Sequence, residues 1–200
     1  MDPEFKGAVD FHRHLCLDIA IGYRAAKVLM QEMGEQMKNM KELVALVGNE
    51  TCAVDAIQEV TGCTLGKRNL YLTHIGKPVY MLQNTKTGKA VRAYCIYWDT
   101  FDHDALRKAR KEAAGPTATP EQKAAFQKLT DGKIAEILAA PESALFSVTH
   151  VTLPPPPKSG KYDAEPCDAC AEHTNIALLT EKGGKRICKE CMESDKAKSV

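Results

Sequence analysis

The sequence has 200 residues, enough for one domain of ordinary size and one small additional module. Its composition, 44% hydrophobic and 26% charged, is typical of a globular protein, and a formal net charge of +1 provides no overall basic field for nucleic acid or an anionic membrane. The longest apolar stretch, Leu15–Met33, is interrupted by charged side chains, and the N-terminus lacks the pattern of a secretion signal, so we expect a cytoplasmic protein without a membrane partner.

The predicted elements mix helices with short strands. Apolar residues spaced by three or four positions indicate a helix over 18–33, and the capping residues Asn49 and Thr51 indicate a second helix that reaches Val60 and stops at Gly62. Strands and two later helices are predicted from their composition: strands 43–47, 70–75, 79–83, 90–98 and 144–153, and helices 102–114 and 120–139. This pattern predicts an α+β domain in which helices pack on one side of an antiparallel sheet.

A run of prolines divides the chain. Pro154–Pro157 have no backbone N–H donor and a fixed φ, so they favour a stiff spacer over a helix or strand. We therefore predict a core domain at 1–153, a proline-rich linker at 154–160 and a zinc-ribbon domain at 161–200. The last domain is too small to fold on a hydrophobic core alone, so we expect a metal to stabilise it.

Four cysteines in the small domain have the spacing of a zinc site. Cys167 and Cys170 form one pair and Cys188 and Cys191 the other, with 17 residues between the pairs. Four thiolates complete a tetrahedral shell, which predicts a structural zinc in a zinc-ribbon or treble-clef module; iron on the same thiolates and four unrelated free thiols are the alternatives. Seven basic and eight acidic residues in 160–200 argue against a nucleic-acid interface.

A second group of potential ligands lies near the N-terminus. In an extended segment, alternate side chains point to the same side, so His12, His14 and Cys16 are expected to converge on one ion. The alternative is a coincidental pair of histidines on a loop. Zinc, nickel and iron all suit imidazole and thiolate ligands, so a second transition metal is expected here if the group converges.

Cys52 and Asp55 are the next candidates. Cys52 is predicted in the first turn of a helix, where free N–H groups and the helix dipole favour the thiolate. Asp55 lies three residues later and therefore on the same helix face, where it is either a general base or a simple surface charge. Cys52 is accordingly a candidate metal ligand or nucleophile, with Asp55 as its acid–base partner.

Several motifs, in this order, resemble the E-subunit family of formylmethanofuran dehydrogenase: His12-x-His14-Leu15-Cys16, then 21–26 (IGYRAA), 52–58 (CAVDAIQ) and 62–67 (GCTLGK). The resemblance covers roughly residues 10–100 and implies a dimeric α+β core with a metal or thiol site that includes Cys52. It also implies a link to a molybdenum or tungsten enzyme. Two positions depart from the family pattern: Arg13 stands where glycine is usual, and Leu17-Asp18 where Pro-Gly is usual.

The sequence therefore supports three functional hypotheses. The first is a metal-binding accessory or regulatory protein, associated with an oxidoreductase or with cofactor handling, and forming a homodimer. The second is a stand-alone enzyme that uses Cys16 or Cys52 with Asp55. The third is a nucleic-acid-binding ribbon protein, which the near-neutral charge disfavours.

Overall fold

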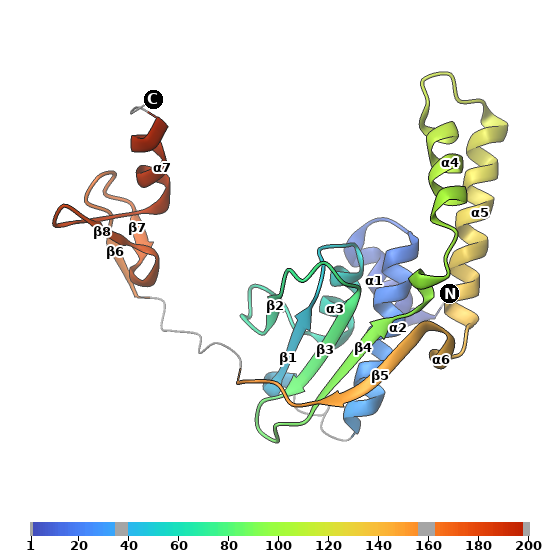
Figure 1. Cartoon of the computed structure of the whole chain (residues 1–200), viewed down its shortest axis with the longest axis horizontal. Helices are drawn as coiled ribbons and strands as arrows, with labels where there is room; N and C mark the ends of the chain where they lie inside the picture. Colours follow the sequence, from blue (N-terminus) through green and yellow to red (C-terminus); the bar gives the residue numbers. More distant parts are fainter. Residues whose placement is uncertain (1, 35–39, 156–162, 198–200) are drawn as a thin grey trace. The chain divides into compact units, whose positions relative to one another are not determined.

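The computed structural model describes residues 2–34, 40–155 and 163–197. It comprises two compact units, Met1–Pro156 and Pro157–Val200, which are described separately below (Figure 1). Most of the predicted linker at 154–160 lies outside the described residues. Within the described ranges, no helix is both long and apolar enough to cross a membrane.

The larger unit is built on a five-stranded sheet with the order β2-β1-β3-β4-β5. Its strands are β1 (Leu43–Val47), β2 (Leu70–Leu72), β3 (Val79–Asn84), β4 (Ala90–Cys95) and β5 (Phe146–Val151). All neighbouring pairs are antiparallel except β1 and β2, which are parallel because a helix connects them. The predicted α+β class with a mainly antiparallel sheet is therefore confirmed, with one parallel pair at the edge.

Three helices cover one face of this sheet (Figure 1). They are α1 (Pro3–His12), α2 (Leu17–Met33) and α3 (Ala53–Thr61). Most of α2 is buried, because it packs on β3 and β4 and also against α3. Alternate residues of the strands, such as Leu82 and Ala93, face these helices and have no exposed surface. This helix layer holds the N-terminal candidate residues.

A helical hairpin extends from the sheet (Figure 1). It consists of α4 (His103–Ala114) and α5 (Pro120–Ala139), and the short helix α6 (Glu142–Leu145) returns the chain to β5. Asp102 caps α4, and Thr119 with Gln122 forms a capping box on α5. At the other end of α5, Arg24 of α2 donates hydrogen bonds to the carbonyl oxygens of residues 137, 138 and 140, at 2.9, 2.7 and 2.8 Å. These bonds satisfy the last carbonyls of α5 and fasten it to α2.

The smaller unit contains two short hairpins and one helix. The hairpins pair β6 (Ala164–Pro166) with β7 (His173–Asn175), and β8 (Thr180–Lys182) with β9 (Lys185–Ile187); α7 (Lys189–Ala197) follows. Gly183 and Gly184 both have positive φ, at 61° and 74°, as a two-residue hairpin turn requires. A 3-10 helix at Ile176–Leu178 precedes β8.

The segment before α2 differs most from expectation. The sequence predicts an extended segment through His12, but α1 continues to this residue and ends at Arg13, whose φ is 62°. Asp2 caps the helix by accepting from the amides of Glu4 and Phe5, at 2.8 and 3.2 Å. The helical periodicity of this segment rests on only two buried residues, Phe5 and Ala8, which is too short a pattern to indicate a helix from sequence alone.

Three predicted strands also have different ends. The strand expected at 70–75 stops at Leu72, and the one expected at 90–98 stops at Cys95, where the 3-10 helix Tyr97–Asp99 follows. The segment 144–153 is divided between α6 and β5. At the second of these strands the apolar run continues through residues 96–98, beyond the last residue that pairs with β5, so composition alone overestimates the strand.

Candidate metal centres

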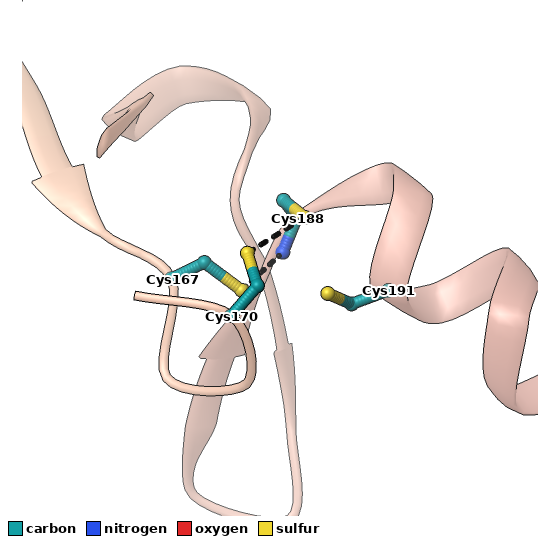
Figure 2. A group of neighbouring side chains, drawn as sticks. All are labelled: Cys167, Cys170, Cys188 and Cys191. Carbon is teal, nitrogen blue, oxygen red and sulfur yellow. Dashed lines mark hydrogen bonds between the residues drawn. The ribbon is translucent and has the colours of Figure 1, made fainter. Parts of the chain in front are cut away.

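The structure brings the four C-terminal cysteines together. The donor sulfurs of Cys167, Cys170, Cys188 and Cys191 all lie within 4.8 Å of one another, and Figure 2 shows them directed at a common centre. The sulfurs of Cys170 and Cys188 are 4.0 Å apart. Tetrahedral thiolates at the usual zinc–sulfur distance are separated by about 3.8 Å, so this group fits such an ion with little adjustment. It is a metal-binding cluster with a complete set of four protein ligands.

Backbone amides prepare this cluster for negative charge. The sulfur of Cys167 accepts from the amides of Cys188 and Ala169, at 3.3 and 3.4 Å. These amides, with that of Cys170, lower the pKa of the Cys167 thiol to about 6. Cys188 directly precedes α7, and Cys191 lies in its first turn (Figure 2). Hydrogen bonds to sulfur thus favour the thiolate at Cys167, whereas the adjacent thiols of Cys188 and Cys170 raise the pKa of Cys191, so a metal that binds there must displace its proton.

A second cluster lies in the larger unit. One ligand atom each from His12, Cys16 and Cys52 lies within 4.8 Å of the other two. His12 is the last residue of α1, whereas Cys16 and Cys52 are the N-cap residues of α2 and α3. Cysteines that are far apart in the sequence meet here because α2 and α3 pack against each other along their length. We call this group the core site.

The two core-site cysteines sit at helix N-termini, yet burial dominates at one of them. Neither side chain makes a capping hydrogen bond to its helix, so both sulfurs lie beside a helix N-terminus and remain available to other partners. Burial raises the pKa of the Cys16 thiol to about 11, and the nearby Ile19 amide opposes this rise without reversing it. Without a metal, Cys16 is therefore a neutral thiol at physiological pH, and metal binding must displace its proton.

Asp55 orients the histidine of the core site. The Nδ1 atom of His12 lies 2.7 Å from Oδ2 of Asp55, and Gln58 donates from Nε2 to the other carboxylate oxygen at 3.3 Å. A carboxylate on one ring nitrogen fixes the tautomer and leaves the other, Nε2, as the ligand atom. The sequence suggests an acid or base role for Asp55, but in the structure this residue lies behind the histidine. Gln58 is a site residue that the sequence did not single out, although its spacing from Asp55 places both on one helix face.

His14 lies outside the core site. Its side chain is exposed, and its ring centroid is 6.0 Å from that of His12. Among the described residues, the core site thus offers three potential protein ligands, two sulfurs and one nitrogen, a donor set that suits zinc, nickel or iron. A tetrahedral ion bound to three protein ligands keeps one position for an exchangeable molecule. The core site therefore differs in chemistry from the closed four-cysteine cluster.

The two remaining cysteines are structural. Cys63 is fully buried, and its thiol donates to the carbonyl of Leu43 at 3.4 Å. Cys95 is also fully buried, at the end of β4. Burial raises the pKa of both thiols, to about 11 for Cys95, so they behave as small neutral core residues.

Comparison with known proteins agrees with this architecture. A structure from Syntrophus aciditrophicus, described as FmdE-like and named after tungsten formylmethanofuran dehydrogenase, superposes with a TM-score of 0.64 and 20% identity, and the match covers 94% of this chain and 90% of that one. At this identity the match shows a shared fold. A curated protein from Archaeoglobus fulgidus, named "Probable S-adenosyl-L-methionine-binding protein", is 28% identical over 94% of this chain. The chain spans about half of that relative, 52% of its length.

The sequence model of one family matches most of the larger unit. That family is described as "FmdE, Molybdenum formylmethanofuran dehydrogenase operon", and the match covers residues 11–147, which include the core site and most of the sheet. The resemblance inferred from the motifs is thereby confirmed, and the chain belongs to the FmdE family.

Proposed function

We propose that this protein is an accessory or regulatory component of a molybdenum- or tungsten-type redox enzyme system. In this proposal the four-cysteine cluster holds a structural zinc, and the core site holds a second transition metal. The observation that supports it is the contrast between a closed cluster of four ligands and a core site of three. One site stabilises a fold, and the other has a position at which a ligand or a partner's group can exchange.

The protein's own residues prepare the core site for this role. The Asp55 carboxylate holds His12 in the orientation that presents Nε2. The N-termini of α2 and α3 supply partial positive charge beside the sulfurs of Cys16 and Cys52. A bound transition metal would supply Lewis acidity and an exchangeable coordination position.

Metal analysis tests the two-site part of the proposal. We expect about two metals per full-length chain, and one in a Cys16→Ser/Cys52→Ser variant. A Cys167→Ser/Cys170→Ser variant is expected to keep the core-site metal. One metal per wild-type chain, unchanged by Cys16→Ser/Cys52→Ser, would contradict a core metal site.

Isolation from the native cell tests the accessory role. We expect the tagged wild-type protein to co-purify with a molybdenum- or tungsten-containing oxidoreductase or with a protein that matures its cofactor. The Cys16→Ser/Cys52→Ser variant, matched in charge and size, is the control for non-specific capture. Recovery of the wild-type protein without any such component would contradict this role.

A stand-alone enzyme is the second candidate, because three protein ligands leave room for substrate. The name of the Archaeoglobus relative makes S-adenosyl-L-methionine a compound to include in a substrate screen. Turnover that Cys16→Ser and Cys52→Ser both abolish would favour this candidate.

We also propose a homodimer, for which sedimentation equilibrium would give twice the chain mass of 21.9 kDa.

A further inference from the structure

A cleft of about 380 Å³ lies where α1 and α2 meet the end of α5 and the short helix α6, at the base of the helical hairpin (Figure 1). Its volume is within the range of small-molecule sites in proteins, roughly 300–1,000 Å³. None of the residues that line it belongs to either cysteine cluster. The cleft is therefore a candidate binding site that is separate from the metal centres.

The floor of this cleft is apolar. Phe5 and Tyr23 line it with side chains that are only 1% and 6% exposed, and their ring centroids are 5.1 Å apart. Leu138 of α5, which is partly buried against the core, also lines it. Aromatic and aliphatic surfaces of this kind hold the apolar part of a small molecule.

Charged side chains of both signs line the same cleft. Asp2 and Glu142 are acidic, whereas Arg24 and Lys27 are basic, so the formal charges of the lining cancel. A lining without net charge does not favour a simple anion or a simple cation. It does offer separate positive and negative contacts to a molecule that carries both charges.

Only some of these charged groups are available to a ligand. The guanidinium group of Arg24 already donates to three carbonyl oxygens, and Asp2 accepts from two amides as the cap of α1. Lys27 pairs with Glu4 at 2.6 Å, which uses one of the three donors of its ammonium group. The carboxylate of Glu142 makes no hydrogen bond or ion pair with any described residue. Lys27 and Glu142 therefore remain as the two charged contacts.

Gln31 adds a neutral donor beside Lys27. It follows Lys27 by four residues and therefore lies one turn further along the same face of α2. Its side-chain amide also has no hydrogen bond within the described part of the chain. An ammonium group and an amide N–H can both donate to one carboxylate. The cleft thus offers two donors on α2, an acidic acceptor on α6 and an apolar floor.

We propose that this cleft binds a free α-amino acid with an apolar side chain. The ligand's carboxylate accepts from Lys27 and Gln31, and its ammonium group donates to Glu142. Its side chain packs on the apolar floor, so the bound molecule bridges α2 and α6. This inference goes beyond the accessory role and needs no metal at either cluster, so the two proposals can fail independently.

Isothermal titration calorimetry of the full-length protein provides the test, with L-leucine as the first probe and L-methionine and L-phenylalanine to vary the side chain. Two analogues each lack one charge of L-leucine: 3-methylbutylamine has no carboxylate, and 4-methylpentanoic acid has no ammonium group. We expect each analogue to bind at least about tenfold more weakly than L-leucine, because each loses one charge-assisted contact.

Two variants assign the two ends of the ligand. Glu142→Gln is expected to weaken the binding of L-leucine about tenfold, but not that of 4-methylpentanoic acid. Lys27→Met is expected to weaken L-leucine similarly, but not 3-methylbutylamine. Glu112→Gln in α4 is the matched control, because it makes the same change at an exposed carboxylate outside the cleft. Thermal midpoints without ligand show that each variant is folded.

Three outcomes would overturn the inference. The first is the absence of binding for all three amino acids, and the second is an affinity for L-leucine that neither Glu142→Gln nor Lys27→Met changes. The third is an analogue that binds as tightly as L-leucine, since the cleft would then recognise a cation or an anion alone. Weakening by Glu142→Gln and Lys27→Met but not by Glu112→Gln would support the proposed contacts.

Discussion

At the scale of single residues, the core site depends on how His12 is held. Its Nδ1 atom pairs with Asp55, whose second oxygen is in turn bonded to Gln58. This chain of hydrogen bonds fixes the orientation of the His12 ring and leaves its other nitrogen, Nε2, available to a metal. If the proposed metal binds there, the Asp55 carboxylate would affect its affinity without contacting it.

Asp55→Asn is expected to lower the affinity of the core site for zinc by about 10- to 100-fold, because the amide no longer fixes the tautomer and orientation of the His12 ring. Competition with a chromophoric chelator measures this affinity. Asp10→Asn is the control, since Asp10 is an exposed carboxylate that pairs with Lys6 on α1. Equal affinities in the two variants would show that Asp55 does not orient a ligand.

The protonation of Cys16 gives a prediction about pH. Burial raises its pKa from 9.0 to about 11, so the metal-free thiol is neutral below that pH and becomes the reactive thiolate above it. We expect alkylation of Cys16 by iodoacetamide to accelerate about tenfold per pH unit from about pH 8 to about pH 10, as followed by peptide mass spectrometry. Bound metal should suppress this labelling. A rate that levels off near pH 9 would show that the pKa is not raised.

The sequence predicts the two clusters unequally well, for a physical reason. The four C-terminal cysteines lie in two short pairs, so local spacing alone brings each pair to one ion. The core site needs three helices to meet, and its geometry depends on the end of α1. Since Arg13 adopts a left-handed conformation directly after His12, the alternation expected for an extended segment is lost and His14 lies outside the group.

At the scale of elements, the core site depends on the close contact between α2 and α3. Gly22 of α2 lies against the backbone of Ala53, the first residue of α3. A Cβ atom at Gly22 would come within 2.3 Å of the Ala53 carbonyl oxygen and 2.6 Å of its Cα. Only glycine permits this approach, and the contact adjoins Cys52.

Gly22→Ala is therefore expected to destabilise the protein by an amount at the upper end of roughly 1–3 kcal/mol, because a methyl group would have to displace backbone. It should also weaken metal binding at the core site. Gly132→Ala in α5 is the matched control: its added Cβ meets no atom within 4 Å, so we expect a gain of up to about 1 kcal/mol from helix propensity. Urea unfolding measures both changes, and equal effects would contradict the close-contact explanation.

Most elements follow from periodicity and capping, but their ends and pairings do not. The helix expected over 18–33 and the helix that ends at Gly62 are confirmed, because strong apolar spacing and a left-handed glycine mark them. Helix α1 is not evident from the sequence, because only two of its residues, Phe5 and Ala8, are buried. The parallel pairing of β1 with β2 depends on the crossover through α3, which no local pattern encodes.

At the scale of the whole molecule, the two units differ in what stabilises them. The larger unit has an extensive core of buried apolar residues. The core of the smaller unit, in contrast, consists of Cys167, Ile187 and Cys188, with a few partly buried neighbours. A metal bound by the four cysteines would therefore supply much of the folding free energy of the smaller unit.

A strong chelator is accordingly expected to unfold residues 163–197 while the larger unit stays folded. In an NMR spectrum of the full chain, the amide signals of the smaller unit should collapse to unfolded positions and those of the five-stranded sheet should remain. Returning zinc should restore the lost signals. Loss of both sets of signals together would show that the two units do not fold independently.

The hydrogen bonds of Arg24 have a mechanical consequence. Arg24 lies in the helix that Cys16 begins, and its guanidinium group grips the end of α5 at three carbonyls. Helix α2 cannot slide along its axis without breaking these bonds or taking α5 with it. The hairpin of α4 and α5 is therefore attached at one end, through Arg24, to helix α2, which begins next to Cys16. A fluorophore or spin label at Ala118, in the turn that joins the two helices, would therefore report a displacement of α2 as a change in the position of the far end of this hairpin.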